Sequence, residues 1–493
     1  MITKSTLQSH KTVFLLFFFL ITLTGNAQIG IGTTTPDATS ILDITSTAKG
    51  ILAPRMTTIQ RNAIVTPAQG LLVYDTDLKA FYYFSTPSGW LPLLTSAVGR
   101  TNFKRVKTAA DLAPELALGG SVYQLSSNTL YEINGTITLT APINLNDAYV
   151  SGMDTNEDVL SFPGGTIFQG TTGGSIRNVT LRGGRAFNIT GGTSLLVQNT
   201  VIDGFIGTTA TGTVGTISGL GLYFGNIIQF IGNSNGVTYS NIANLLLSNQ
   251  AWFSSNNGTF ETFTGTFGLI QKNSGFSTVD ASDLALDVNG IVSVGTATLL
   301  GTVFSGTTTN TAGYVRGYPA ASTYTGYNFS NAWTVDAPGI PREADSEATG
   351  DINLDAVVGS GITTTFSGTG SGSRIKLLGT TTSNSLFRFT KDLNNKITYR
   401  GNKSRYFQVA ASVSYQTSAD ATIILYIAKN GSVLTETKVY GKPSGGLFST
   451  AGIMALPIVG TVQMKTGDYI EIWAERYAGT GDIQTVSLNL TAR

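Results

Sequence analysis

The sequence predicts an all-β protein, with a right-handed parallel β-helix in the middle of the chain, a small β module before it and a jelly-roll sandwich after it. Three observations predict this class. Apolar residues make up 41% of the 493 residues, charged residues only 12%, and glycine occurs 58 times. Ile, Val, Phe and Tyr recur at short spacing between Gly and Asn turns, which is typical of strands. Almost no segment has the apolar period of an amphipathic helix.

The first 27 residues have the pattern of a secretory signal peptide. Lys4 and Lys11 flank the start of the apolar run VFLLFFFLITL, and small residues lead to a predicted cleavage between Ala27 and Gln28. This run is too short to span a bilayer and no later run reaches about 18 apolar residues, so we expect no membrane span. We predict a secreted or cell-surface protein at the exterior of the outer membrane; a retained N-terminal anchor is the alternative.

Composition excludes several classes of site. Loss of Lys4, Lys11 and His10 with the leader lowers the 30 basic residues to 28, against 29 acidic ones, and leaves no histidine and no cysteine. Disulfides, thiolate nucleophiles, Ser-His-Asp triads and His-ligated metals are therefore excluded. We expect no cofactor and no metal, and the balanced charge gives no reason to expect a nucleic-acid partner.

Residues 28–95 are expected to form a first module of short strands separated by Gly and Asp turns. Four motifs stand out, at Ile29–Thr35 (IGIGTTT), Lys49–Thr57 (KGILAPRMT), Gly70–Asp77 (GLLVYDTD) and Gly89–Trp90. Together they resemble a module common at the start of secreted and surface proteins of Bacteroidetes, and similar modules of fibre-like phage proteins. The resemblance implies export and display, not a reaction.

Several aliphatic residues of this module can be buried only against another element or another chain. They are Ile41, Leu42, Ile44, Ile51 and Leu52. A small β cap on the next domain is an alternative to a ligand-binding module. Residues 96–118, with a short helix expected at Ala109–Leu116, are interpreted as a linker or cap.

Residues 119–330 are predicted to form the parallel β-helix. Short apolar clusters alternate with Gly and Asn, and three of them align on Asn178, Asn199 and Asn241, with separations of 21 and 42 residues. A period of about 20 residues is typical of a solenoid, in which each coil buries aliphatic side chains and stacked Asn side chains form a ladder. We expect about ten coils; a β-sandwich with similar turns is the alternative.

The remaining chain is divided into a junction and a C-terminal domain. Residues 331–380 hold an acidic cluster and a Gly/Ser-rich stretch, and are interpreted as a junction or linker. Residues 381–493 contain alternating strands at even spacing, with Asn430–Gly431 as a strong hairpin signal. About eight strands in this length predict a jelly-roll sandwich.

Three motifs of this domain, Phe407–Ala411, Ile423–Gly431 and Met464–Ile472, resemble those of tumour-necrosis-factor-like and complement-like jelly rolls. Met464 stands where the family pattern has Leu, which conserves volume. Members of that family are usually trimers around a threefold axis, so the resemblance implies a homotrimer. The residues that could supply its seam are Tyr469, Ile472 and Trp473. A monomeric sandwich is the alternative.

Five aromatic residues in a polar, Gly-rich segment are candidates for contact with a glycan, because such rings suit stacking on sugar faces. They are Tyr314, Tyr318, Tyr324, Tyr327 and Trp333. Packing at strand edges explains the same residues without a ligand.

Catalysis by this chain would have to use carboxylates, Tyr, Lys or Arg. The acidic candidates are Asp147, Asp154, Glu157, Asp158, Asp203, Asp280, Asp283 and Asp287. Acids in Gly-rich loops are more often turn formers, so we assign no catalytic residue. The segment Asp351–Asp355 imitates the start of a calcium loop, but Ala356 and Ile362 stand where an EF-hand needs Gly and Glu.

These patterns predict an exported, elongated, fibre-like homotrimer with a structural or adhesive role, which presents a binding surface to a glycan or to a partner surface. The rival function is that of an enzyme, a polysaccharide lyase or glycoside hydrolase that acts in a groove of the β-helix. A filament subunit is a third class.

Overall fold

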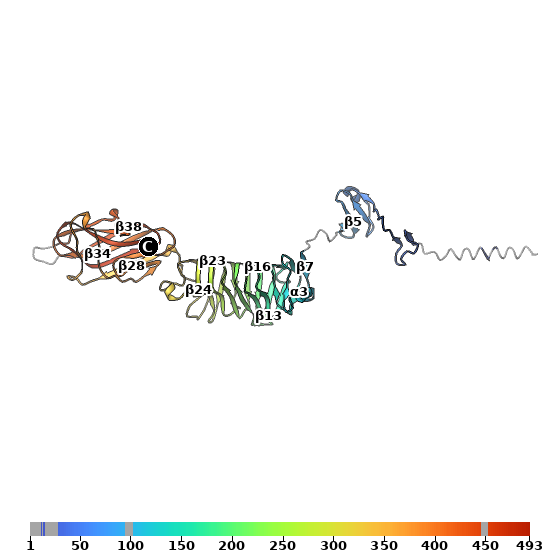
Figure 1. The fold of residues 1–493 in the computed structure, drawn as a ribbon, viewed down its shortest axis with the longest axis horizontal. Helices are drawn as coiled ribbons and strands as arrows, with labels where there is room; N and C mark the ends of the chain where they lie inside the picture. The colour runs from blue at the N-terminus through green and yellow to red at the C-terminus, as the bar shows by residue number, and fades with distance from the viewer. Residues whose placement is uncertain (1–10, 12, 15–27, 94–101, 445–451) are drawn as a thin grey trace, which may run out of the picture. The chain divides into compact units, whose positions relative to one another are not determined.

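The computed structural model describes residues 28–93, 102–444 and 452–493, together with Lys11, Val13 and Phe14. The rest of the predicted signal peptide, including Ala27, lies outside the described residues. The chain divides into two compact units, Met1–Arg100 and Thr101–Arg493, drawn in Figure 1. No helix of the described part combines the length and the apolar character that a bilayer span requires.

The first unit has little core of its own. Its elements are β1 (Ile29–Ile31), β2 (Leu42–Ile44), β3 (Arg55–Met56), α2 (Thr58–Asn62), β4 (Leu72–Asp75), β5 (Ala80–Ser85) and β6 (Gly89–Pro92). β1 pairs only with β2, whereas β3 to β6 form a separate four-stranded sheet. α2 begins at a capping box between Thr57 and Gln60. Within the described part of this unit, Val73 is the single buried hydrophobic side chain.

The second unit begins with a strand and a helical cap. β7 (Phe103–Val106) pairs in parallel with β9, and η3 (Ala109–Leu112) and α3 (Ala113–Gly119) follow it. Asp111 accepts hydrogen bonds from the backbone N–H groups of Lys107 and Thr108 at the start of η3. Leu112 is buried in the main core, so this segment closes one end of the solenoid that follows.

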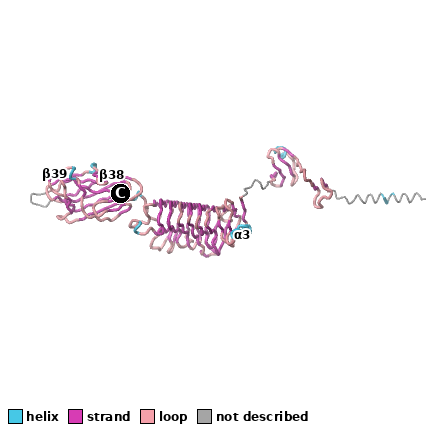
Figure 2. Tube along the Cα trace, in the orientation of Figure 1, coloured by secondary structure: helices cyan, strands magenta, loops and turns pink. Residues whose placement is uncertain are grey.

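The middle of the chain is a parallel β-solenoid of about nine turns, built from the described residues between Phe103 and Asp336. Figure 2 shows its strands stacked in successive coils. The strands after β7 are β8 (Tyr123–Gln124), β9 (Leu130–Ile133), β10 (Thr136–Thr138), β11 (Ile143–Asn144), β12 (Tyr149–Ser151), β13 (Val159–Gly170), β14 (Gly174–Arg177), β15 (Thr180–Ile189), β16 (Gly192–Asp203), β19 (Thr213–Ser218), β20 (Leu220–Ile231), β21 (Asn235–Ser240), β22 (Asn244–Trp252), β23 (Thr259–Val279), β24 (Leu284–Leu300), β25 (Val303–Gly306), β26 (Val315–Arg316) and β27 (Trp333–Asp336). A small hairpin, β17 (Phe205–Ile206) with β18 (Thr209–Ala210), projects from one turn.

Register places equivalent side chains of successive turns above one another inside the solenoid. One column of paired positions, all buried, contains Leu195, Tyr223, Leu245, Ile270, Ala297 and Trp333. Each large apolar side chain that is fully buried in this way contributes about 1.5–3 kcal/mol. Repetition of such columns gives the solenoid a continuous core within one chain.

The neighbouring column contains a charge. Lys272 lies between Leu247 and Leu299 in the register and is 1% exposed. Its Nζ lies 3.0 Å from Oε1 of Glu261, which is also completely buried, and 5.2 Å from the ring centroid of Phe260. Burial raises the pKa of Glu261, although the ammonium of Lys272 opposes that shift. Each charge offsets the desolvation cost of the other, because a single unpaired charge would be strongly unfavourable at this buried position.

One corner of the solenoid repeats a left-handed backbone conformation. Asn178, Asn199, Ile227, Asn249, Ser274 and Gly301 occupy it in successive turns, with φ between +47° and +65°. Asn199 donates from Nδ2 to Oδ1 of Asn178 at 3.2 Å, so a short Asn ladder forms there. A second asparagine pair lies inside the solenoid, where Asn233 donates from Nδ2 to Oδ1 of Asn256 at 2.9 Å.

The predicted alignment of three asparagines is correct for two of them. Asn241 lies at a different corner, where Gly219 and Gly265 precede and follow it in the register. The turns differ in length, since Asn199 follows Asn178 by 21 residues whereas Ile227 follows Asn199 by 28. Two residues that are separated by twice the average period, such as Asn199 and Asn241, therefore do not lie at the same corner.

The C-terminal domain is a sandwich of two antiparallel sheets around its own core. One sheet contains β31 (Leu386–Phe387), β28 (Thr349–Asp355), β40 (Ile483–Ala492), β34 (Arg405–Thr417) and β38 (Met454–Met464), with β29 (Ile362–Thr364) beside β40. The other contains β32 (Phe389–Lys391), β33 (Ile397–Tyr399), β39 (Tyr469–Gly479), β35 (Ala421–Lys429) and β36 (Ser432–Val433), with β30 (Ile375–Lys376) and β37 (Val439–Gly441) at its sides. Short 3₁₀ turns complete the unit at η4 (Ala320–Ser322), η5 (Asp345–Glu347), η6 (Ser371–Ser373) and η7 (Thr435–Thr437).

The strand order is that of a jelly roll. Among the eight main strands in chain order (β28, β33, β34, β35, β37, β38, β39 and β40), the first, eighth, third and sixth share one sheet. The second, seventh, fourth and fifth share the other. This alternation between two sheets is typical of double Greek-key sandwiches.

The segment 331–380, which was expected to be a junction or linker, contains strands of both neighbouring domains. β27 pairs with β24 and so belongs to the solenoid. β28 pairs with β40 along six residues and so belongs to the sandwich. Because the partner of β28 follows more than 120 residues later in the chain, local composition does not reveal this strand.

Candidate functional site

The first unit exposes aliphatic side chains to a degree that is unusual for a folded domain. We call Ile29, Ile31, Ile41, Leu42, Ile51 and Leu52 the N-terminal apolar surface. Ile41 is 80% exposed and Leu52 is 79% exposed. Several exposed aliphatic side chains in one short segment of the chain indicate a region that another molecule covers. Of the five residues expected to need another element or another chain for burial, Ile41, Leu42, Ile51 and Leu52 are exposed, whereas Ile44 is half-buried.

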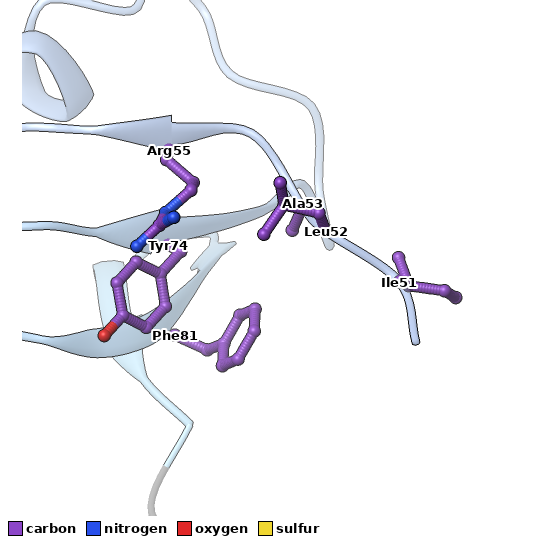
Figure 3. Close-up of a pocket in the computed structure, with 6 residues that line it drawn as sticks. All are labelled: Ile51, Leu52, Ala53, Arg55, Tyr74 and Phe81. Carbon is purple, nitrogen blue, oxygen red and sulfur yellow. The ribbon is translucent and has the colours of Figure 1, made fainter. Parts of the chain in front are cut away.

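A shallow pocket of about 160 Å³ lies at the end of this surface, shown in Figure 3. Its lining residues are Ile51, Leu52, Ala53, Arg55, Tyr74 and Phe81. The Arg55 guanidinium lies 5.4 Å from the ring centroid of Tyr74, and that ring meets Phe81 edge-on at 5.2 Å. The pocket is therefore an apolar recess with one cation on its wall, suited to a hydrophobic side chain of another chain.

The predicted seam in the sandwich needs a correction at Ile472. This residue is 0% exposed and belongs to the sandwich core, because the inward positions of β39 alternate through Ile470, Ile472 and Ala474. It cannot contact a partner chain. Tyr469 packs against the ammonium of Lys396 at 4.8 Å, and its role stays a prediction.

Trp473, the third predicted seam residue, is half-buried on the same strand. Its Nε1 donates to Oε2 of Glu471 at 2.9 Å. Its role in a seam also stays a prediction.

The five aromatic candidates divide into core and surface groups. Trp333 is 1% exposed, and its Nε1 donates to the hydroxyl of Tyr318 at 3.0 Å, so it cannot stack on a sugar. Tyr314 packs on Phe304 and donates to the backbone carbonyl of Gly306. Packing thus accounts for Trp333, Tyr318 and Tyr314.

Tyr324 and Tyr327 lie in a loop after η4 and behave differently. Both line a pocket of about 610 Å³. The Tyr327 ring stacks on Phe387 of the sandwich with centroids 3.9 Å apart, and Tyr324 meets Phe387 edge-on at 5.4 Å. Tyr324 and Tyr327 are therefore the two members of the predicted aromatic set that line this pocket.

Buried charges tie the end of the solenoid to the sandwich. Arg388, fully buried on the sandwich side, is paired with Asp345 and donates from Nη2 to the backbone carbonyl of Trp333 at 2.6 Å. Asp345 also accepts hydrogen bonds from the backbone N–H groups of Asn402 and Lys403. These contacts hold Trp333, the first residue of β27, against the sandwich.

Sequence reasoning missed Phe387, Arg388 and Asp345. Their only signals are a single arginine and one acid of the cluster in residues 331–380, more than 40 residues apart in the chain. Arg388 also adopts a left-handed backbone conformation with φ of +55°, which its residue type does not announce.

Several acidic candidates of the solenoid are occupied by structural contacts. Asp158 accepts from the backbone N–H groups of Gly135, Met153 and Asp154. Burial alone would raise its pKa, but these hydrogen bonds hold the pKa of Asp158 below its usual value. They organise a turn, as Asx residues commonly do.

Two further acids form ion pairs across neighbouring turns. Asp203 pairs with Arg182 at 2.8 Å, and Asp287 pairs with Arg316 at 2.9 Å. Asp283 accepts from the backbone N–H of Gly258, and burial raises its pKa. Within the residues that the structure describes, no group of three or more His, Cys, Asp or Glu side chains is arranged to hold a metal ion.

Asp351, the first residue of the imitated calcium loop, also has a structural role. Its carboxylate accepts hydrogen bonds from Ser383 Oγ and from the backbone N–H groups of Asn384 and Ser385. Asp351 therefore fixes the segment 383–385, which forms one rim of the pocket beside Tyr324.

Comparison with protein families gives one match. Residues 30–111 match the family described as "Phage tail like trimerisation region". The match covers a minority of the chain, and it includes the whole N-terminal apolar surface apart from Ile29. A search of curated proteins found no match.

Comparison with solved structures gives distant likenesses. The tailspike protein of Acinetobacter phage vB_ApiP_P1 is 10% identical, with a TM-score of 0.29, over 88% of this chain and 100% of the other. The enzymatically active domain of bacteriophage CBA120 tailspike protein 4 is 9% identical, with a TM-score of 0.24, over 88% of this chain and 77% of the other. Eiger TNF from S. frugiperda is 10% identical, with a TM-score of 0.21, over 30% of this chain and 93% of the other. At these scores, none of the three transfers an activity to this chain.

Proposed function

We propose that this protein is an exported, fibre-like homotrimer that presents a binding surface to a glycan or to a partner surface. In this proposal the N-terminal module associates three copies, and the solenoid and the jelly roll carry the presented surface. Its place of action is outside the cell, at the exterior of the outer membrane, and the motifs of the module favour a Bacteroidetes origin.

The observation that carries the proposal is the coincidence of two independent features. The N-terminal apolar surface leaves Ile41 and Leu52 almost fully exposed in one chain. The same stretch matches a trimerisation region. An exposed apolar surface needs a cover, and the family match supplies the identity of that cover as two further copies of the chain.

The energetics agree with association. Burial of one Ile or Leu side chain contributes about 1.5–3 kcal/mol, and the six residues of the N-terminal apolar surface are present in every copy. Association costs an estimated 4–15 kcal/mol in lost translational and rotational freedom for each pair. Burial of several of these side chains in each copy is comparable in size to that cost.

Sedimentation equilibrium of the full chain from Gln28 onward tests the proposal. We expect a single species with three times the chain mass at micromolar concentration. A monomer at all concentrations tested would contradict the trimer and remove the basis of the fibre-like function. Growth of ever larger species with concentration would instead indicate a filament subunit.

A further inference from the structure

We propose that the pocket between the end of the solenoid and the jelly roll is a subsite for a neutral saccharide, in which Tyr324 and Tyr327 contact the sugar ring. We call it the junction pocket. This inference rests on the proposed function, because it names the site and the ligand class on the surface that the trimer presents.

The size of the junction pocket suits a small part of a glycan. Its volume of about 610 Å³ lies within the range of about 300–1,000 Å³ that ligand sites occupy. Its walls come from two segments far apart in the chain. They are lined by Thr323, Tyr324, Thr325 and Tyr327 on the solenoid side, and by Ser383, Asn384, Ser385, Leu386, Phe389, Thr390 and Lys391 on the sandwich side.

Both rims of the junction pocket are fixed by hydrogen bonds. On the sandwich side, Asp351 accepts from the segment 383–385, with the backbone N–H of Ser385 at 2.6 Å. On the solenoid side, Thr323 Oγ1 donates to the backbone carbonyl of Tyr327 at 3.3 Å and to that of Phe329 at 3.0 Å. The carboxylate of Glu343 accepts from the backbone N–H of Phe329 at 2.9 Å. A pocket held in this way loses little conformational freedom on binding, which favours a weakly binding neutral ligand.

The aromatic side chains are held in defined orientations. Phe387 is 1% exposed and contacts both tyrosine rings, one stacked and one edge-on. Tyr324 and Tyr327 are themselves half-buried, so each ring has one part against the protein and another toward the pocket. Rings that are fixed and partly exposed offer an apolar face to the C–H side of a sugar ring.

The polar groups of the pocket indicate a neutral ligand. Hydroxyl and amide side chains predominate among its lining residues, and none of these residues is a carboxylate. The single charged lining residue, Lys391, donates from Nζ to the backbone carbonyl of Thr381 at 2.9 Å. Hydroxyls and amides both donate and accept hydrogen bonds, which matches the hydroxyl groups of a saccharide.

An oligosaccharide array probed with the full trimer tests this inference. The array carries neutral and acidic bacterial oligosaccharides, and each one that binds is then titrated with Tyr324→Ala and Tyr327→Ala. We expect the wild type to bind neutral structures and each variant to bind them about tenfold more weakly. Tyr327→Phe should bind within about threefold of the wild type, since it keeps the ring. The matched control is Tyr406→Ala, which removes an exposed tyrosine of β34 outside the pocket and should leave binding unchanged.

The outcomes separate this inference from the proposed function. Binding that Tyr324→Ala and Tyr327→Ala leave unchanged would place the glycan elsewhere and overturn the subsite, while the trimer seen by sedimentation would stand. Absence of binding to any oligosaccharide by the wild-type trimer would overturn the subsite as well. Circular dichroism of each variant confirms that its fold is retained.

Discussion

Aliphatic side chains are buried in the solenoid but exposed in the N-terminal module. In the solenoid, Leu195, Leu245 and Ile270 stack above one another and are fully buried within one chain. In the module, Ile41 and Leu52 project into solvent, and the sequence around them is rich in Thr and Ser. A repeating coil supplies its own neighbours above and below, whereas a module of short strands with one buried hydrophobic side chain does not.

The comparison shows which part of the chain buries its apolar side chains within one molecule and which part does not. The solenoid has a continuous core, so its stability is a property of one molecule. In the proposed trimer, the stability of the N-terminal module depends on the concentration of copies, because association would bury its apolar surface. Four sets of substitutions test that contrast, in order of decreasing expected effect.

The double variant Ile41→Asp/Leu52→Asp should abolish the trimer. It places two charges in each copy where apolar contacts are expected, and the loss over three copies is on the order of 10 kcal/mol. Sedimentation equilibrium should show a monomer at micromolar concentration. Val292→Asp is the matched control, since Val292 is 81% exposed on the solenoid. If Val292→Asp also dissociated the trimer, the seam would extend along the solenoid and the contrast would fail.

Within the solenoid, Lys272→Met should destabilise the chain by about 3–5 kcal/mol, because it leaves Glu261 buried without a partner. The double variant Lys272→Met/Glu261→Leu should recover most of that loss, since both positions have apolar neighbours in the register. Lys272 lies between Leu247 and Leu299, and Glu261 lies between Val237 and Leu286. Denaturant unfolding followed by tryptophan fluorescence measures both. A double variant as unstable as the single one would contradict this account of the pair.

In the sandwich, Asp468→Asn should cost about 2 kcal/mol at neutral pH. Burial of Asp468 opposes ionisation, but hydrogen bonds from the Lys465 backbone, Asn430 and Lys429 lower its pKa from 3.8 to about 2. A lowered folded-state pKa stabilises the fold above pH 3.8, and this contribution disappears as the pH falls through about 2. Unfolding free energies at a series of pH values should therefore converge for wild type and variant near pH 2. A constant difference at every pH would argue against the carboxylate as its source.

The smallest expected effect is a gain. Ile227 has φ of +54°, a conformation that costs a β-branched residue about 1–3 kcal/mol. Ile227→Asn should raise the free energy of unfolding by about 1 kcal/mol, because Asn is the residue found at this corner in three other turns. Asn249→Ile provides the reverse test and should lower stability by a similar amount. A loss of stability in Ile227→Asn would show that the isoleucine side chain has a packing role at this corner.

The sequence sufficed for the solenoid because its signal is repeated. Many coils carry the same alternation of apolar clusters with Gly and Asn, so single errors of register, such as that at Asn241, did not alter the prediction. It also sufficed to recognise that Ile41 and Leu52 lacked a partner, since nothing apolar near them could form a core.

The parts that sequence reasoning missed depend on contacts between distant residues. β28 joins the sandwich through β40, and Arg388 reaches Asp345 and the carbonyl of Trp333. No local sequence period or motif indicates these long-range contacts. The burial of Ile472 was missed because alternate positions of β39 carry large side chains on both faces, so the pattern does not identify which face lies inside.

The corner occupied by Asn178, Asn199 and their counterparts has a consequence for how such a chain can change over generations. Six successive turns, from Asn178 to Gly301, pass through this position with the same left-handed backbone conformation, while the number of residues from one such position to the next varies from 21 to 28. A duplication or deletion that starts and ends at two such positions adds or removes one whole coil and leaves the adjoining backbone undisturbed. The length of the solenoid can therefore change in steps of about 4.8 Å, one coil at a time, while both of its ends stay the same.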